Sequence, residues 1–468
     1  MNGPEHQGSP VSPRARVLPW PGRSRRAKAA ERKEAAVHDA LHLLRNGLCA
    51  VCRERDESAT RWLSYFIVEN HTEEGTCARV QAAAGLCPAH TRRLLGDASA
   101  SWLMPQVLDL ALTGGTRILG EPGSRPARCP CCVAGGEAAQ RALDTLLRAF
   151  GRQQVREALE GGAVCLPHTT LLTTRVPWTD GLHLAETASA LLEAGGRETA
   201  WSAGMDADAP VRAALLDRLA PLVVEAEHQQ RLSVTSRWKA DVATDACPLC
   251  LAEHRETRRL LTWAATTTDR GHPAREESAL CERHLHDLTA IGGPNVEAVL
   301  ADNRDQRSAR LLRFRRLLGE GRKGRADAGS HLLSVPRCRA CAEERTAVRR
   351  QAALLSAQLH DPAHAREYEQ THGICLRHAL EWRGGLPAPV HEVLTARLAL
   401  LRWEIDEALR KQDWHTRHEH KGAEMSVGQR APTLLDGRVY AGLPAPGEQA
   451  DVRTEDVPKN PHLISRRP

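Results

Sequence analysis

Cysteine and histidine recur along this chain in two short motifs whose side chains are typical metal ligands. Four Cys-x-x-Cys motifs alternate strictly with four Cys-x-x-His motifs, and 30 to 34 residues separate each Cys motif from the next His motif. With 14 Cys and 22 His among 468 residues, chance would give only about 0.4 and about 0.7 such pairs, so the repeat is not accidental. Pairing each Cys motif with the His motif that follows it predicts four sites with these ligands: Cys49, Cys52, Cys87 and His90; Cys129, Cys132, Cys165 and His168; Cys247, Cys250, Cys281 and His284; Cys338, Cys341, Cys375 and His378.

Three thiolates and one imidazole form a donor set that favours zinc. A Cys-x-x-Cys turn puts two sulfurs on one side of a tight knuckle, and Cys-x-x-His at the start of a helix puts both ligands on one face. Two such halves complete a tetrahedron, so we expect about four zinc ions per chain. An iron–sulfur cluster with one His ligand is the less favoured alternative, and the chain has no Cys-x-x-Cys-His haem motif.

A site with four protein ligands has no open position for a substrate or an activated water, so these sites indicate structure rather than catalysis. The sequence contains no His-Glu-x-x-His motif, no Gly-x-x-x-x-Gly-Lys-Ser/Thr phosphate-binding loop and no nucleophile elbow. We therefore expect no catalytic residue and no further cofactor. The favoured function is a non-enzymatic scaffold that binds a protein partner.

Two cysteines, Cys77 and Cys131, lie outside the four ligand sets. Cys131 falls between two expected ligands, at the expected start of a helix and beside a metal ion. That position predicts a lowered thiol pKa, which would make Cys131 reactive and the second site a redox-responsive or zinc-responsive switch. A harmless substitution at this position is nevertheless the favoured interpretation.

The helices that must position these ligands can be recognised from apolar spacing. An apolar residue precedes each His motif, and a second follows the histidine by four residues: Leu86 and Leu94, Val164 and Leu172, Leu280 and Leu288, Ile374 and Trp382. This frame predicts a packed helix whose ligands point inward. Trp263 and Trp403, at helical spacing, are expected in the core. We expect Gly114 and Gly115 to stop a helix that begins near Trp102.

The fold class that follows is mainly α, a tandem array of four helical zinc-stapled modules. The interval from Cys132 to Cys250 is longer than that from Cys52 to Cys132, which predicts two pairs of modules joined by a connector. The expected divisions are a disordered basic tail at 1–35, modules at 36–122 and 123–205, a connector helix at 206–238, modules at 239–328 and 329–415, and a disordered tail at 416–468. Because only 3% of residues are aromatic, each module would depend on its metal for stability.

The net charge of +6 is concentrated at the ends of the chain. Residues 1–35 carry eight Arg and Lys against three Glu, whereas the body between the tails is formally neutral. A neutral body is a poor surface for binding the phosphates of nucleic acid. The main alternative to a scaffold is therefore a nucleic-acid-binding regulator that uses the basic N-terminal tail and the Arg313 to Arg325 region. No apolar run of about 20 residues and no secretory signal is present, and we expect a cytoplasmic protein without a membrane span.

The repeated unit resembles bacterial families of helical metal-binding proteins without an assigned activity, whose members show Cys-Pro-x-Cys followed by Leu-Cys-x-x-His. Cys247-Pro-Leu-Cys250 with Leu280-Cys281-Glu-Arg-His284 is the best match. The resemblance covers each metal unit but neither tail nor the connector. It implies metal binding and no particular activity.

Overall fold

The computed structural model describes residues 25–45, 49–193, 246–267, 280–320, 327–328, 338–382 and 385–437, and within them the regular structure is helical, as predicted. The N-terminal half contains α1 (Arg25–Leu44), α2 (Ala50–Tyr65), η1 (Phe66–Asn70), α3 (Glu74–Ala82), α4 (Pro88–Leu95), η2 (Ala98–Leu103), α5 (Met104–Gly120), α6 (Pro130–Ala149), α7 (Gln153–Glu160), α8 (Leu166–Thr173) and α9 (Trp178–Glu193). The C-terminal half contains α13 (Pro248–Thr266), α15 (Glu282–Ile291), α16 (Val296–Gly319), α18 (Arg339–Gln358), α19 (Pro362–Glu369), α20 (Leu376–Trp382), α21 (Ala388–Arg410), η3 (Ala423–Ser426) and α22 (Val427–Asp436).

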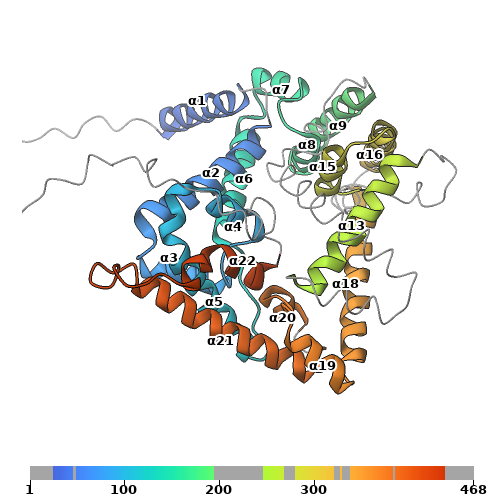
Figure 1. Cartoon of the computed structure of the whole chain (residues 1–468). Coiled ribbons are helices and arrows are strands. Elements are labelled where there is room, and N and C mark those ends of the chain that lie inside the picture. The colour runs from blue at the N-terminus through green and yellow to red at the C-terminus, as the bar shows by residue number, and fades with distance from the viewer. Residues whose placement is uncertain are drawn as a thin grey trace, which may run out of the picture.

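The centre of the N-terminal half is an antiparallel pair of helices, α2 and α6 (Figure 1). Ser58 on α2 donates a hydrogen bond of 3.2 Å to the carbonyl of Ala134, near the start of α6. The first residues of α2 instead share a buried core with Leu146 and Phe150 at the far end of α6. The two helices therefore run in opposite directions, and each begins where the other ends.

The C-terminal half repeats this arrangement with α13 and α18. Thr257 in the middle of α13 donates a hydrogen bond of 2.5 Å to Glu344, near the start of α18. The end of α13, with Leu261 and Ala265, packs in the same core as Cys338 and Ala340 at the start of α18. Each half is thus organised around one antiparallel pair of long helices that both begin at a Cys-x-x-Cys motif.

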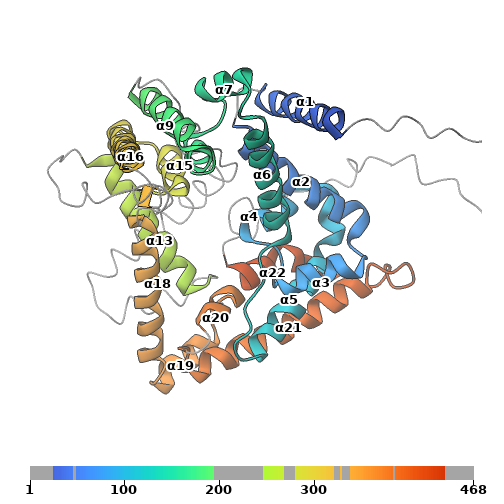
Figure 2. The same cartoon turned by 180° about the vertical axis from the view of Figure 1, so that it is seen from behind.

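Among the described residues, the contacts between the two halves include two equivalent helix pairs. Each interface joins the long helix that follows the first His motif of one half, α5 or α16, to the last long helix of the other half, α21 or α9. Arg402 on α21 pairs with Asp109 on α5, and Arg315 on α16 pairs with Glu186 on α9 at 2.9 Å. The pair α5–α21 therefore corresponds to the pair α16–α9, with the roles of the two halves reversed. Four helix pairs follow one another around the molecule: α2–α6, α5–α21, α13–α18 and α16–α9 (Figures 1 and 2).

The two halves are therefore in direct contact with each other. The connector itself, residues 206–238, lies outside the described residues. The module boundaries remain predictions. No helix in the described part of the chain is long and apolar enough to cross a lipid bilayer.

Both predicted tails are partly helical. Helix α1 begins at Arg25, inside the expected N-terminal tail, and η3 and α22 lie inside the expected C-terminal tail. Helix α22 packs against α4 and α5 of the N-terminal half and against α20 and α21 of the C-terminal half. The buried residues Val427, Ala431 and Leu435, spaced by four, provide its apolar face. The charge and proline content of this segment indicated a disordered tail, and composition alone does not reveal the apolar face.

The expected helix stop at Gly114 and Gly115 is also wrong, because α5 continues through both residues to Gly120. A Cβ on Gly114 would lie 1.9 Å from the carbonyl oxygen of Gln81 on α3, and one on Gly115 would lie 2.3 Å from a methyl carbon of Leu376 on α20. The two glycines are therefore required for close helix packing. Gly292, by contrast, ends α15 with φ of 71°, as its place after the helix predicts.

Candidate metal centres

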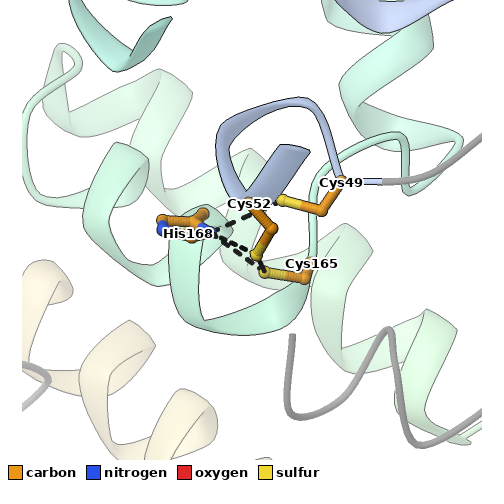
Figure 3. Close-up of side chains that lie close together, drawn as sticks. All are labelled: Cys49, Cys52, Cys165 and His168. Carbon is orange, nitrogen blue, oxygen red and sulfur yellow. Dashed lines mark hydrogen bonds between the residues drawn. The ribbon is translucent and has the colours of Figure 1, made fainter. Parts of the chain in front are cut away.

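The structure gathers all sixteen predicted ligands into four clusters, but it pairs the motifs differently from the sequence prediction. In each half the first Cys motif joins the last His motif, and the two inner motifs join each other. The clusters are I (Cys49, Cys52, Cys165 and His168), II (Cys87, His90, Cys129 and Cys132), III (Cys247, Cys250, Cys375 and His378) and IV (Cys281, His284, Cys338 and Cys341). Figure 3 shows cluster I, with its two cysteines from the start of α2 and the other two ligands from α8.

Helix length explains why neighbouring motifs do not pair. From Cys52 to its last residue, Tyr65, helix α2 carries the chain about 20 Å, whereas the next α-helix, α3, has nine residues and is only about 14 Å long. Cys87 therefore stays near the far end of α2, where α6 begins. The 20 residues of α6 then bring the chain back, so that Cys165 reaches the start of α2. Sequence spacing alone could not reveal this, because the regular interval of 30 to 34 residues from each Cys motif to the next His motif favours the pairing of neighbours.

All eight motifs share one local structure, in which the first cysteine directly precedes a helix and the second ligand lies in its first turn. Three of the motifs have proline directly after the first cysteine, and this residue opens the helix in each of them: Pro88, Pro130 and Pro248. Unpaired amide groups and the positive end of the helix dipole at this position favour thiolate over thiol. The local structure therefore prepares each motif for binding a cation.

The distances within the clusters fit a single tetrahedral ion. In every cluster the Nδ1 atom of the histidine faces the three sulfurs, at 3.0 to 3.6 Å. One sulfur pair in each cluster is separated by 3.6 to 3.8 Å. Around an ion with bonds of about 2.3 Å to sulfur and about 2.0 Å to nitrogen, the edges of a tetrahedron would be about 3.8 Å between sulfurs and about 3.5 Å between sulfur and nitrogen. The four clusters are therefore compatible with metal binding.

The electrostatics of three clusters show that their sulfurs attract positive charge. Burial alone would lower the pKa of His90, but hydrogen bonds to the neighbouring sulfurs of Cys129 and Cys132 raise it to about 9. His168 behaves in the same way beside Cys49 and Cys52, with a pKa of about 9. Burial also opposes protonation of His284, whose pKa is raised to about 11 by Cys281, Cys338 and Glu344. A divalent cation would satisfy the same sulfurs better than one imidazole proton.

Cluster III is the most deeply buried of the four, with all its ligands at most 1% exposed. Burial raises the pKa of Cys247 to about 12 and lowers that of His378 well below its ordinary value. Helix α22 contributes to this burial through Gly437, whose φ is 70°. A Cβ there would lie 2.4 Å from Sγ of Cys250 and 2.7 Å from Sγ of Cys375. Gly437 was not identified from the sequence, because nothing local relates it to ligands more than 60 residues away.

Cluster II is the most accessible, because Cys132 is exposed and Cys87 is half-buried. Cys131 is fully buried, and the adjacent Cys129 thiolate together with burial raises its pKa well above the ordinary value. The expectation of a reactive Cys131 is therefore wrong: the helix points this thiol into the core while Cys132 faces solvent. Burial and Glu73 likewise raise the pKa of Cys77, which donates a hydrogen bond of 3.1 Å to the carbonyl of His71.

The expected apolar frame of the His motifs is confirmed. The residues directly before the four His motifs are all buried: Leu86, Val164, Leu280 and Ile374. The leucines that follow the histidines of clusters I, II and IV are buried too: Leu172, Leu94 and Leu288. Trp382, which follows the histidine of cluster III, is partly buried. The returning helices are therefore packed as predicted. Trp403 is not in the core, since 59% of it is exposed.

Comparison with protein families, with curated proteins and with solved structures found no match to this chain. A function can therefore be proposed from the geometry of the clusters alone.

Proposed function

We propose that this chain is a non-enzymatic zinc-binding protein with four structural Cys3His sites, and that its metal-stabilised body is a scaffold for a protein partner. The observation that carries the proposal is the convergence of eight motifs, distant in sequence, into four clusters of tetrahedral dimensions. Three thiolates and one imidazole favour zinc over magnesium or calcium, which prefer oxygen ligands. The many reduced thiols suit a reducing compartment such as the cytoplasm.

A structural role is favoured by the position of the clusters. Each joins the start of one long helix to a short helix from a distant part of the chain, so a bound ion would connect segments that few aromatic residues are available to hold together. Four protein ligands per cluster leave no coordination position for a substrate. This is the basis for proposing that the protein has no catalytic activity of its own.

The scaffold role is supported by large apolar side chains on the surface. Leu400 and Trp403, one turn apart on α21, are 50% and 59% exposed, and Trp414 is 68% exposed. Exposed tryptophan is common at the centres of protein interfaces because it offers a large contact area with few rotatable bonds. Helix α21 buries its opposite face, including Leu398 and Ile405, in the core.

The zinc proposal is tested by elemental analysis and native mass spectrometry of protein purified under reducing conditions. About four zinc ions per chain are expected. Two or fewer after reduction and zinc resupply would contradict the proposal.

The scaffold proposal is tested by cross-linking in cells, comparing wild-type protein with a variant that carries Leu400→Ala and Trp403→Ala. A partner recovered with wild type should be lost with this variant and retained with Leu354→Ala, which changes an exposed leucine on α18. All three proteins should hold the same amount of zinc. Recovery of the same partners with all three would show that the α21 surface is not the binding surface.

A further inference from the structure

Two of the four clusters carry a buried carboxylate that the other two lack. Clusters III and IV extend their Cys motif to Cys-x-x-Cys-x-x-Glu, which adds Glu253 and Glu344, and both glutamates are buried. At the corresponding positions of clusters I and II the chain has Arg55 and Gly135. A helix places a residue three positions after a ligand on the same face, one turn further along. The carboxylates therefore lie directly behind the metal ligands.

A second difference falls in the His motifs of the same two clusters. The residue before the histidine is arginine in clusters III and IV, Arg377 and Arg283, whereas it is proline or alanine in clusters I and II. Arg283 pairs with Glu344, and Arg377 Nη2 lies 3.1 Å from Oε2 of Glu253. In both clusters the arginine belongs to one motif and the glutamate to the other. Each ion pair therefore connects the two halves of its cluster from outside the ligand shell.

The ion pair of cluster IV also reaches a metal ligand. Oε1 of Glu344 lies 3.0 Å from Nε2 of His284, and Nη2 of Arg283 lies 2.8 Å from the same nitrogen, while Nδ1 of His284 faces the sulfurs. Glu344 further accepts a hydrogen bond from Thr257 on α13. Accepting the Nε2 proton fixes the tautomer in which Nδ1 is free to bind a metal, and it makes the imidazole a stronger donor. In cluster III the arginine reaches two ligands, since Arg377 Nη2 lies 3.1 Å from Nε2 of His378 and 3.7 Å from Sγ of Cys250.

We infer that the Arg283–Glu344 and Arg377–Glu253 pairs position the ligands of clusters IV and III, so that these two clusters retain a bound metal longer than cluster I does. The inference rests on the metal-binding part of the proposed function. The four charged residues are positioning residues, because none of them is itself among the ligands.

Clusters I and IV provide the deciding comparison because burial alone predicts the opposite order. Cluster I has its three cysteines buried, whereas Cys281 and Cys341 of cluster IV are only half-buried. If solvent access controlled release, cluster IV would lose its ion before cluster I. If the ion pair controls release, cluster I loses its ion first. Cluster III is both buried and held by an ion pair, so it should be the last of these three clusters to release its metal ion.

The experiment challenges the fully zinc-loaded chain with an excess of chelator, counts the remaining ions by native mass spectrometry, and alkylates the cysteines that become free. Peptide mapping then assigns each release step to a cluster. In wild-type protein the cysteines of cluster I should be alkylated before those of cluster IV. The reverse order, or simultaneous release from the two clusters, would overturn the inference, and this arm needs no substitution.

Substitutions then test each pair. Glu344→Gln should accelerate release from cluster IV by about tenfold or more and leave cluster I unchanged, since outer-shell partners of metal ligands typically change affinity by about 10- to 100-fold. Glu343→Gln is the matched control, because it removes a carboxylate from the same turn of α18 and leaves the contacts of Glu344 in place. Arg377→Lys should preserve slow release from cluster III, whereas Arg377→Met should not. Equal release rates in Glu344→Gln and Glu343→Gln would contradict the inference.

Cobalt-substituted protein supplies a readout that a general loss of stability would not give. Glu344→Gln should change the visible absorption of about one bound ion in four, while the helical circular dichroism stays at the wild-type value. An unchanged cobalt spectrum would count against a positioning role for Glu344. A chain that never holds about four ions would refute the proposed function instead, so the two failures are distinguishable.

Discussion

Among single residues, the exposed ligand Cys132 distinguishes cluster II from the other three. A metal-bound thiolate is attacked by peroxide only when the reagent can reach it, and three of the four clusters have no exposed cysteine. The burial of Cys131 removes it as the first target. The order of oxidation should therefore follow the exposure of the ligands rather than the presence of an extra thiol.

Mild peroxide is predicted to release metal from cluster II first, as Cys132 is oxidised and pairs with a neighbouring thiolate. Cys131→Ser should leave the dose dependence of this release unchanged. The measurement is zinc release against peroxide dose in both proteins, with peptide mapping of the oxidised cysteines. Slower release from the variant would show that Cys131 takes part after all.

At the scale of helices, a glycine at a contact point allows two helices to pack closely, because it has no side chain. Gly114→Ala on α5 is predicted to destabilise the protein by about 1 to 3 kcal/mol, because its Cβ would collide with the backbone of α3. Gly136→Ala on α6 is the control, since a Cβ there meets nothing within 4 Å. It should stabilise the helix by up to about 1 kcal/mol. Denaturant unfolding of both variants measures the difference, and equal midpoints would contradict the packing argument.

Helix α22 offers a second test at this scale, through the glycine that ends it. Gly437→Ala introduces a side chain both at positive φ and against two ligand sulfurs, so it should displace α22 and expose cluster III. Faster alkylation of Cys250 and Cys375 in the metal-loaded variant is the expected result. Gly123→Ala, also at positive φ but with nothing within 4 Å of its Cβ, controls for backbone strain alone. Similar alkylation rates in the two variants would mean that α22 does not cover the cluster.

Helix positions and ligand identities could largely be predicted from the sequence, because both depend on local spacing. Val390, Leu394, Leu398, Leu401 and Ile405 repeat at intervals of three and four, and all are buried in α21. The stop at Gly292 was predictable for the same reason. Gly114 was not, because whether a glycine ends a helix or admits a neighbour depends on a helix that packs there only in the folded chain.

For the whole molecule, the pairing of the Cys and His motifs could not be predicted from their spacing in the sequence. Consecutive and nested pairing use the same sixteen residues, and the lengths and directions of helices such as α2 and α6 decide between them. The two interfaces between the halves were hidden too. They depend on contacts such as Arg402 with Asp109, between residues almost 300 positions apart.

Nested pairing changes the expected result of damaging one cluster. Cys250→Ser should loosen the segments that cluster III joins, namely the start of α13 and the region from Cys375 through α22, rather than the segment from Cys281 to the end of α16. Hydrogen exchange with mass spectrometry would locate the loss of protection. Loss confined to residues 247–319 would support consecutive pairing and contradict the structure.

The most direct test of the central claim, that eight motifs form four nested metal centres, is to count metal ions in single-cluster variants by native mass spectrometry. Wild-type protein should hold about four zinc ions. Cys49→Ser combined with His168→Ala removes two ligands from one nested cluster and should therefore lower the count to about three. Under consecutive pairing the same two changes would damage two sites and lower the count to about two, a result that would contradict nested pairing.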